Sequence, residues 1–298
     1  MKKALKKLYS IIPFKKSIFS FIKVAFKPGH SIYKHLHFKG VFEVNVNKEK
    51  SFKINHYGFE IENEIFWNDI YNGWEKVSLK IWSDLCEQPE VIFDIGANTG
   101  VYSLLAKTTN PKAKVYAFEP VKRVHEKLVE NIELNNFDTI AENKAVSDKT
   151  GVATIYDKDT EHTLSVTINK DLSPNKEDSI PVEITTIRLD EYITANKIKK
   201  IDLLKIDVET HEPEVLEGFG MYLKEFEPTL IIEILNDEVA NKIEGYISDI
   251  DYCYYVIDEK TGVKKVSSLR KSDYFNFLIC KPEIAASLNS IALFEGKY

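Results

Sequence analysis

From residue 91 onward, short apolar runs alternate with segments of helical spacing. The apolar runs predict buried strands at 91–96, 114–120, near Ala141–Val146, 201–209 and 229–235. The intervening segments predict helices at 101–108, 121–135, 214–223 and 237–247. Strands that alternate with helices are typical of βαβ units, so the pattern predicts an α/β fold with a parallel sheet.

Other segments alternate apolar and polar residues with a period of two, as half-buried antiparallel strands do. Residues 40–66 do so around a polar turn at Asn47–Lys50, which predicts a β-hairpin. Residues 151–188 predict an antiparallel β insertion, and the segments 252–258 and 274–282 predict a closing antiparallel hairpin. Helical spacing of Trp74, Val77, Ile81 and Leu85 predicts one further helix within 69–87.

Charge divides the chain unevenly. Residues 1–42 contain ten lysines and no acidic residue, whereas the remaining residues have a formal net charge of −16. An acidic body argues against general nucleic-acid binding, which needs clustered Lys and Arg. These changes in charge and in hydrophobic pattern along the chain predict a basic arm at 1–39, a hairpin extension at 40–68 and a main domain at 69–298.

The arm interleaves lysines with bulky apolar residues up to position 27. Leu5, Leu8, Ile12, Phe19, Ile22 and Phe26 fall near one helical stripe, although Pro13 interrupts it. Three interpretations stay open: peripheral contact with the inner face of a membrane, docking on the acidic body or a partner, and a disordered tail. Three widely spaced cysteines and the lack of a long apolar segment favour a cytoplasmic protein without a disulfide framework.

A strand–turn–helix junction at Asp94–Gly100 carries the pattern of a cofactor site. Gly96 and Gly100 permit a tight turn with close ligand approach, and the next helix begins with free N–H groups. Glu119 ends the following strand, where a carboxylate can accept hydrogen bonds from ribose hydroxyls. Asn98 and Thr99 interrupt the dinucleotide pattern, and Asp94 would repel a pyrophosphate. We therefore favour S-adenosylmethionine over NAD.

The chain resembles the FkbM family of S-adenosylmethionine-dependent methyltransferases over about residues 69–281. The resemblance rests on motifs that occur in this order: GWEKVSLKIWSDL, VIFDIGANTGVYSLLAK, VYAFEPVKRVHEKLVENIELNN, NKAVSD, ITTIRLDEYI, IDLLKIDVETHEPEVLEGF, PTLIIEI and YFNFLI. It implies a Rossmann-like, seven-stranded class I methyltransferase sheet. It also implies cofactor contacts at Glu75, Asp94, Gly96, Ala97, Asn98, Gly100, Glu119, Pro120, Ala145 and Val146.

The predicted fourth strand ends in a group of ionisable residues at 205–212. Methyl transfer to a hydroxyl requires alignment of the reacting atoms and a group that accepts the hydroxyl proton. Our candidates for this base are Asp207, then Glu209, then His211. The family pattern there reads Lys-Ile-Asp-x-Glu-Gly, and Thr210 occupies the glycine position. Lys205 is also interpreted as part of a buried ion network, and Glu233 with Asp207 as a minor magnesium alternative; we predict no metal site.

Three functional classes follow from these residues. The leading one is an O-methyltransferase acting on a hydroxyl of a sugar, a glycan or a small metabolite, with no nucleic acid as partner. The alternatives are an NAD(P)-dependent oxidoreductase and a non-catalytic methyltransferase-fold module in a glycan-assembly complex. We expect the insertion to cover the acceptor, with His162, Thr163 and Ser165 as its polar candidates.

Overall fold

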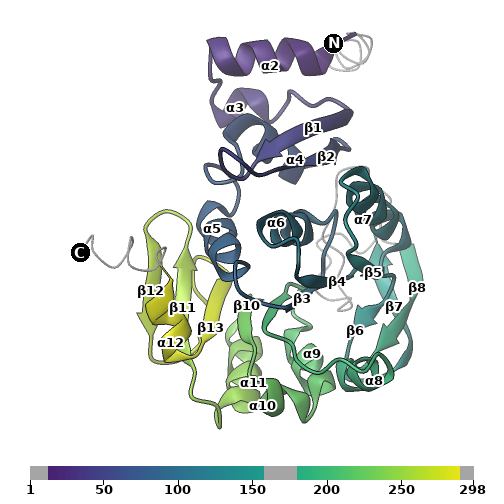
Figure 1. Ribbon diagram of the computed structural model, residues 1–298, viewed down its shortest axis with the longest axis vertical. Coiled ribbons are helices and arrows are strands. Elements are labelled where there is room, and N and C mark those ends of the chain that lie inside the picture. The colour runs from purple at the N-terminus through teal and green to yellow at the C-terminus, as the bar shows by residue number, and fades with distance from the viewer. Residues whose placement is uncertain (1–12, 158–179, 289–298) are drawn as a thin grey trace.

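The computed structural model describes residues 13–157 and 180–288. Figure 1 shows a twisted central sheet between two layers of helices, with the N-terminal elements at one end of the long axis. The helices are α2 (Lys15–Ala25), α3 (His30–Tyr33), α4 (Glu60–Asn68), α5 (Lys76–Leu85), α6 (Val101–Thr109), α7 (Lys122–Leu134), α8 (Leu189–Ala195), α9 (Glu212–Phe219), α10 (Tyr222–Phe226), α11 (Asp237–Ile247) and α12 (Pro282–Ser287).

Within the described residues, thirteen strands form three sheets. They are β1 (Gly40–Asn45), β2 (Ser51–His56), β3 (Val91–Ile95), β4 (Lys114–Phe118), β5 (Ile140–Glu142), β6 (Ala145–Val146), β7 (Gly151–Asp157), β8 (Ile180–Ile187), β9 (Leu203–Ile206), β10 (Thr229–Glu233), β11 (Cys253–Asp258), β12 (Gly262–Val266) and β13 (Asn276–Cys280). The α/β class predicted from the sequence is therefore present.

The main sheet has the order β12-β11-β13-β10-β9-β3-β4-β5. The five strands from β10 to β5 pair in parallel, and β13, β11 and β12 extend the sheet by antiparallel pairing. Side chains that alternate along these strands fill two cores. Ile92 and Ile231 face α5 and α6, whereas Phe93 and Ile232 face the layer of α8, α9 and α11.

The main sheet contains eight strands rather than the seven expected from the resemblance. The additional strand is β12, which pairs with β11 at the edge. No strong strand pattern marks this segment, because GVKKV is short and two of its five residues are lysines. The closing pair is present as β11 with β13, but β12 lies between them in the chain.

The N-terminal hairpin is shorter than expected. Strands β1 and β2 pair antiparallel from Gly40↔His56 to Asn45↔Ser51, around the predicted turn. The expectation of strand-like alternation to residue 66 was wrong, because residues 60–68 form α4. Ile61 and Ile65 have the i, i+4 spacing of a helix, and Ile65, Phe66 and Trp67 are buried. The helix predicted within 69–87 begins only at Lys76.

The predicted insertion is antiparallel in its described part. Strands β7 and β8 pair from Gly151↔Thr186 to Asp157↔Ile180, and β6 adds to β8 in parallel. The third strand predicted near Ala141–Val146 is thus divided between β5 in the main sheet and β6 in this small sheet. The candidates His162, Thr163 and Ser165 lie outside the described residues.

The arm is helical where the structure describes it. Helix α2 begins after Pro13, and its Phe19 packs against Trp67 of α4 with ring centroids 5.7 Å apart. None of the helices in the described segments is both long and apolar enough to cross a bilayer. The proposed domain boundaries at residues 39/40 and 68/69 stay predictions.

Candidate functional site

A cavity of about 270 Å³ opens where β3, β4, β9 and β10 end. Ligands of open parallel sheets bind at this edge, beyond the carboxyl ends of the strands. Nearly all the site residues expected from the sequence line this cavity: Glu75, Asp94, Gly96, Ala97, Asn98, Glu119, Pro120, Ala145, Val146, Asp207, Glu209 and His211. The exception is Gly100, which lies at the N-cap of α6.

The glycines of the Asp94–Gly100 loop are required by its geometry. Gly96 has a φ of +82°, and a Cβ there would collide with the carbonyl oxygen of Asp207. Gly100 has a φ of +95°, and a Cβ there would lie 2.6 Å from Leu128 of α7. Both positions therefore favour glycine on conformational and steric grounds. Because Gly96 has no side chain, the Asp94–Gly100 loop, called the cofactor loop below, can pack closely against the backbone that follows β9.

Glu119 holds two loops with its carboxylate. Its Oε2 accepts a hydrogen bond from the Asn98 N–H at 3.0 Å, and its Oε1 accepts one from the Val121 N–H at 2.9 Å. Burial raises the pKa of Glu119 to about 7, and the two N–H donors lower it less. Since each carboxylate oxygen has two acceptor positions, Glu119 still has capacity to bind hydroxyl groups in the cavity.

Asp94 is the next-to-last residue of β3 and is fully buried. Its Oδ2 accepts a hydrogen bond from Ser103 at 2.6 Å, whereas its Oδ1 is buried and accepts no hydrogen bond from a described residue. Burial raises the pKa of Asp94, and the nearby Lys205 ammonium opposes this rise. A buried acceptor that faces a cavity without a donor is expected to pair with a ligand.

Lys205 is the cation at the centre of the site. It is 3% exposed, donates to Asp207 Oδ2 at 2.8 Å and lies 4.4 Å from the centre of the Tyr102 ring. Burial lowers the pKa of Lys205, but the charges of Asp207, Asp94 and Glu75 raise it above its ordinary value. Lys205 therefore stays an ammonium and compensates the surrounding carboxylates.

Glu75 reaches this cluster from the N-cap of α5. Its Oε2 accepts a 2.6 Å hydrogen bond from the Tyr102 hydroxyl. Burial raises the pKa of Glu75 to about 7, and Lys205 opposes the rise. Glu75 thus faces the cavity beside Lys205, as its position in the sequence led us to expect.

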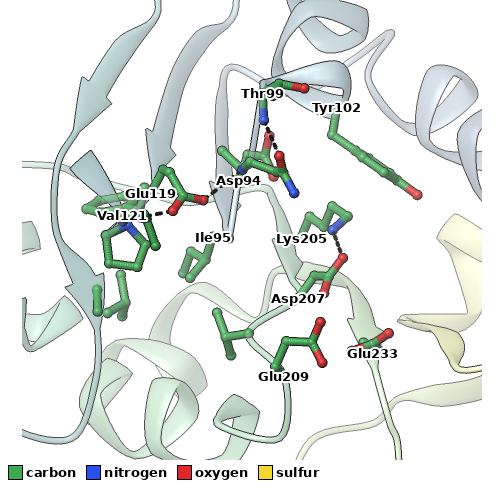
Figure 2. A pocket seen from close by; sticks show the side chains of 18 of the residues that line it. Asp94, Ile95, Thr99, Tyr102, Glu119, Val121, Lys205, Asp207, Glu209 and Glu233 are labelled. Carbon is green, nitrogen blue, oxygen red and sulfur yellow. Dashed lines mark hydrogen bonds and ion pairs between the residues drawn. The ribbon is translucent and has the colours of Figure 1, made fainter. Parts of the chain in front are cut away.

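Carboxylates gather on one side of the cavity. Figure 2 shows Asp207, Glu209 and Glu233 on one side of the strand ends and Glu119 on the other. Burial, together with the charges of Asp207 and Glu209, raises the pKa of Glu233 to about 10. Its Oε2 is buried without a hydrogen bond from the described residues. At neutral pH Glu233 is therefore protonated and can donate a hydrogen bond, but it cannot accept a proton.

The turn after Asp207 places position 210, where the resemblance led us to expect glycine, in a left-handed conformation. Strand β9 ends at Ile206, and Glu209 and Thr210 have φ values of 56° and 76°. Thr210 is β-branched, so this left-handed conformation is strained. Glu212 Oε1 supports the turn by accepting hydrogen bonds from the N–H groups of Val208 and Thr210. The threonine changes the local backbone energy without removing the turn.

His211 is held by neighbours on both ring nitrogens. Its Nε2 lies 2.9 Å from Ser147 Oγ, and its Nδ1 lies 3.5 Å from Glu214. Burial lowers the pKa of His211, although the charges of Glu214 and Asp148 raise it in part. The imidazole is therefore neutral at pH 7. Its two ring nitrogens contact Ser147 and Glu214, which do not belong to the group of Asp207, Glu209 and Glu233.

Several cavity residues were missed by sequence reasoning. Tyr102, Thr99 and Trp74 lie within the quoted motifs but were not named as site residues, and Ile155 and Ile184 come from the insertion sheet. Helical spacing marks Tyr102 only as a core position, so the sequence holds no signal for its contact with Lys205. Among residues 13–157 and 180–288, no three His, Cys, Asp or Glu side chains are grouped to hold a metal ion.

Comparison with known proteins identifies the family. The sequence model of the Methyltransferase FkbM domain matches residues 94–254, which is more than half of the chain. Hexuronic acid methyltransferase AglP of Haloferax volcanii is 27% identical over 48% of this chain and 56% of its own. The 31-O-demethyl-FK506 methyltransferase FkbM of Streptomyces tacrolimicus is 31% identical over 43% of this chain and 59% of its own.

The chain thus spans somewhat more than half the length of these relatives. Among solved structures, the methyltransferase FkbM from Methylobacillus flagellatus KT is similar over 64% of this chain and 43% of that chain. The two share 16% sequence identity, with a TM-score of 0.39. The family match runs from Asp94, near the end of β3, to Tyr254 in β11, and it includes every strand residue that lines the cavity. The chain belongs to the FkbM methyltransferase family.

Proposed function

We propose that this protein is an S-adenosylmethionine-dependent O-methyltransferase that acts on a hydroxyl group of a sugar, a glycan or a small metabolite. One observation carries the proposal. The glycine loop after β3 and the carboxylate of Asp207 line the same cavity, with Gly96 in direct contact with the Asp207 backbone. A bound cofactor and a proton acceptor would therefore meet at one point.

The cavity suits S-adenosylmethionine, the cofactor that family membership supports. The cofactor carries an ammonium and a sulfonium, which complement the carboxylates around the cavity. Asp94 Oδ1 is a buried acceptor without a donor, and Glu119 can bind ribose hydroxyls. Ala145 and Val146 offer an apolar wall beside Pro120 for the adenine.

Asp207 is the proposed base. When bound, S-adenosylmethionine supplies an electrophilic methyl group on a good leaving group. Asp207 would take the hydroxyl proton as the acceptor oxygen bonds the methyl carbon, a role that contributes about 10²–10⁴-fold to the rate. Lys205 orients the Asp207 carboxylate through its 2.8 Å hydrogen bond. Glu209 is the second candidate, and His211 the third because Ser147 and Glu214 already engage it.

Methylation of an oxygen is supported by the name of one relative, a 31-O-demethyl-FK506 methyltransferase. A second relative is a hexuronic acid methyltransferase, so the names of similar chains include both a metabolite and a sugar acid. The family match favours methyl transfer over the NAD(P)-dependent alternative. A non-catalytic module that binds the cofactor is the remaining alternative, and it differs in having no turnover.

Calorimetric titration of the full chain with S-adenosylmethionine and with NAD tests the cofactor. We expect binding of the first only, and at least tenfold weaker binding after Gly96→Ala, because the added Cβ collides with Asp207. Gly245→Ala is the matched control, since a Cβ there meets nothing within 4 Å. Binding of NAD alone would contradict the proposal.

A further inference from the structure

Helix α2 is attached to the body through one face. Phe19 is 5% exposed and packs on Trp67, Ile22 packs against the same core, and Lys23 pairs with Asp69 at 2.6 Å. Phe19 and Ile22 belong to the stripe that the sequence suggested for membrane contact. The structure directs that part of the stripe toward the body instead, so the expected membrane-facing stripe was wrong for these residues.

A second apolar face of α2 points to solvent. Its side chains have exposed fractions of 81% at Phe14, 42% at Ile18, 74% at Phe21 and 89% at Val24. Six of the eleven large apolar side chains that are exposed in the described residues lie between positions 14 and 32. Single exposed apolar residues are common, but a concentration of them on one short segment marks an interaction surface.

Lysines lie along one edge of this apolar face, next to Val24. Lys16, Lys23 and Lys27 have the i, i+7 and i+11 spacing of one helix side, and with Val24 they line a groove whose other wall is the N-terminal hairpin. Lys23 pairs with Asp69 in this groove, whereas Lys16 and Lys27 are exposed. Acidic residues are absent from residues 1–42, which contain ten lysines. An apolar face beside a cationic row is the arrangement by which a helix lies in an anionic lipid interface.

The charge of the arm selects among possible occupants. A second copy that met this face with its own lysine-rich arm, as a symmetric pair would, is repelled, whereas anionic headgroups attract each lysine. Figure 1 shows α2 running across one end of the long axis, with α3 and the hairpin between it and the main sheet. Its outer face can therefore meet a flat surface without contact between that surface and the main sheet.

We propose that α2 docks this protein on an anionic lipid surface. Phe14, Ile18, Phe21 and Val24 enter the boundary between headgroups and acyl chains, and Lys16 and Lys27 contact lipid phosphates. The contact is peripheral, and it uses the face opposite to Phe19.

Co-sedimentation of the full chain with phosphatidylglycerol–phosphatidylcholine vesicles and with pure phosphatidylcholine vesicles tests the proposal. We expect binding to the anionic vesicles that weakens in high salt. Ile18→Asp with Phe21→Asp should lower the partition coefficient at least tenfold. Met221→Asp, at a residue 72% exposed elsewhere on the surface, should leave it unchanged.

Charge reversal separates the electrostatic part. Lys16→Glu with Lys27→Glu should lower anionic binding by more than about fivefold, the effect of losing a single lysine near such a surface. Lys264→Glu, at an exposed position of β12, is the control. Circular dichroism and the unfolding midpoint verify that each variant is folded. Lack of wild-type binding to anionic vesicles would overturn the proposal. So would undiminished binding of the Ile18/Phe21 variant, or a wild-type dimer that these substitutions dissociate without any lipid binding.

Discussion

Lys205 donates a 2.8 Å hydrogen bond to the carboxylate of Asp207, two residues further along the chain, where β9 has just ended. The ammonium is 3% exposed, whereas the Asp207 side chain is 29% exposed and lines the cavity. A buried cation thus holds a carboxylate that also lines the cavity. The Lys205–Asp207 pair therefore bears both on the stability of the sheet and on the orientation of a carboxylate in the cavity.

Replacing Lys205 by Met should destabilise the fold. The substitution leaves the carboxylates of Asp94 and Asp207 without their buried cation, and breaking a buried pair costs about 3–5 kcal/mol. Denaturant unfolding measures the change. Lys200→Met is the control, because Lys200 pairs with Glu90 and Asp202 at the surface and should change the free energy of unfolding by less than about 1 kcal/mol. Equal effects of the two substitutions would argue against a central role for Lys205.

The N-terminal extension should influence cofactor affinity. Glu62 of α4 is fully buried and accepts a 3.0 Å hydrogen bond from the Thr99 hydroxyl of the cofactor loop. Glu62→Leu removes this acceptor, and loss of about 1 kcal/mol of loop stabilisation corresponds to about fivefold weaker binding of S-adenosylmethionine. Calorimetry measures this change.

Glu62→Gln keeps an acceptor oxygen and should bind the cofactor nearly as tightly as the wild type. Burial raises the pKa of Glu62 to about 7, so the neutral amide also resembles the protonated form that prevails at mildly acid pH. If the Leu and Gln variants bound equally well, Glu62 would have no part in positioning the loop.

Thr210→Gly should stabilise the protein by about 1 kcal/mol. Thr210 has a φ of 76°, which is strained for a β-branched residue and free of strain for glycine. Thermal and denaturant unfolding report the difference. Thr210→Ala retains a Cβ and should gain much less. A glycine variant that is less stable than the alanine variant would show that the Thr210 side chain makes a stabilising contact that offsets the strain.

His56 should make stability depend on pH. It is the last residue of β2 and is 1% exposed, and burial lowers its pKa to about 4 from 6.5, with Asn63 opposing the change. The unfolded chain therefore binds more protons between these values, so stability falls as the pH drops through this window. The full effect is about 3 kcal/mol at 1.36 kcal/mol per pKa unit.

Comparison with His56→Gln isolates this contribution, since the buried carboxylates titrate in both proteins. The free energy of unfolding of the wild type, relative to the variant, should decrease from pH 7 to pH 4. A constant difference over that range would show that His56 is not neutral in the folded protein.

The sequence predicted the parts of the fold that local periodicity determines. The runs around Asp94 and Glu119 are apolar and bounded by turns, so their strands and the helices after them were placed within a few residues. Helix α4 was missed because Phe59, Ile61 and Ile65 continue the period-two alternation of the hairpin for part of their length. Strand β12 was missed because its pairing with β11, rather than its own composition, makes it a strand.

The sequence predicted those site residues that lie in a single motif directly after a strand. Gly96 and Asp207 follow strands directly, so their meeting at one sheet edge follows from parallel topology. The contacts of Lys205 with Tyr102 and of Glu62 with Thr99 join residues far apart in the chain. No local pattern encodes such pairs. The face of α2 that packs on the body likewise depends on its contact with α4.

Asp207→Asn tests the central proposal most directly. The full chain and the variant are incubated with methyl-labelled S-adenosylmethionine and an extract of glycans and metabolites from the source organism, and cofactor affinity is measured in parallel. We predict a labelled, O-methylated product with the wild type. The variant should bind the cofactor equally well and turn over about 10²–10⁴-fold more slowly, because it lacks the proton acceptor. Unchanged turnover by Asp207→Asn, or no labelled product from a wild-type protein that binds the cofactor, would contradict the account.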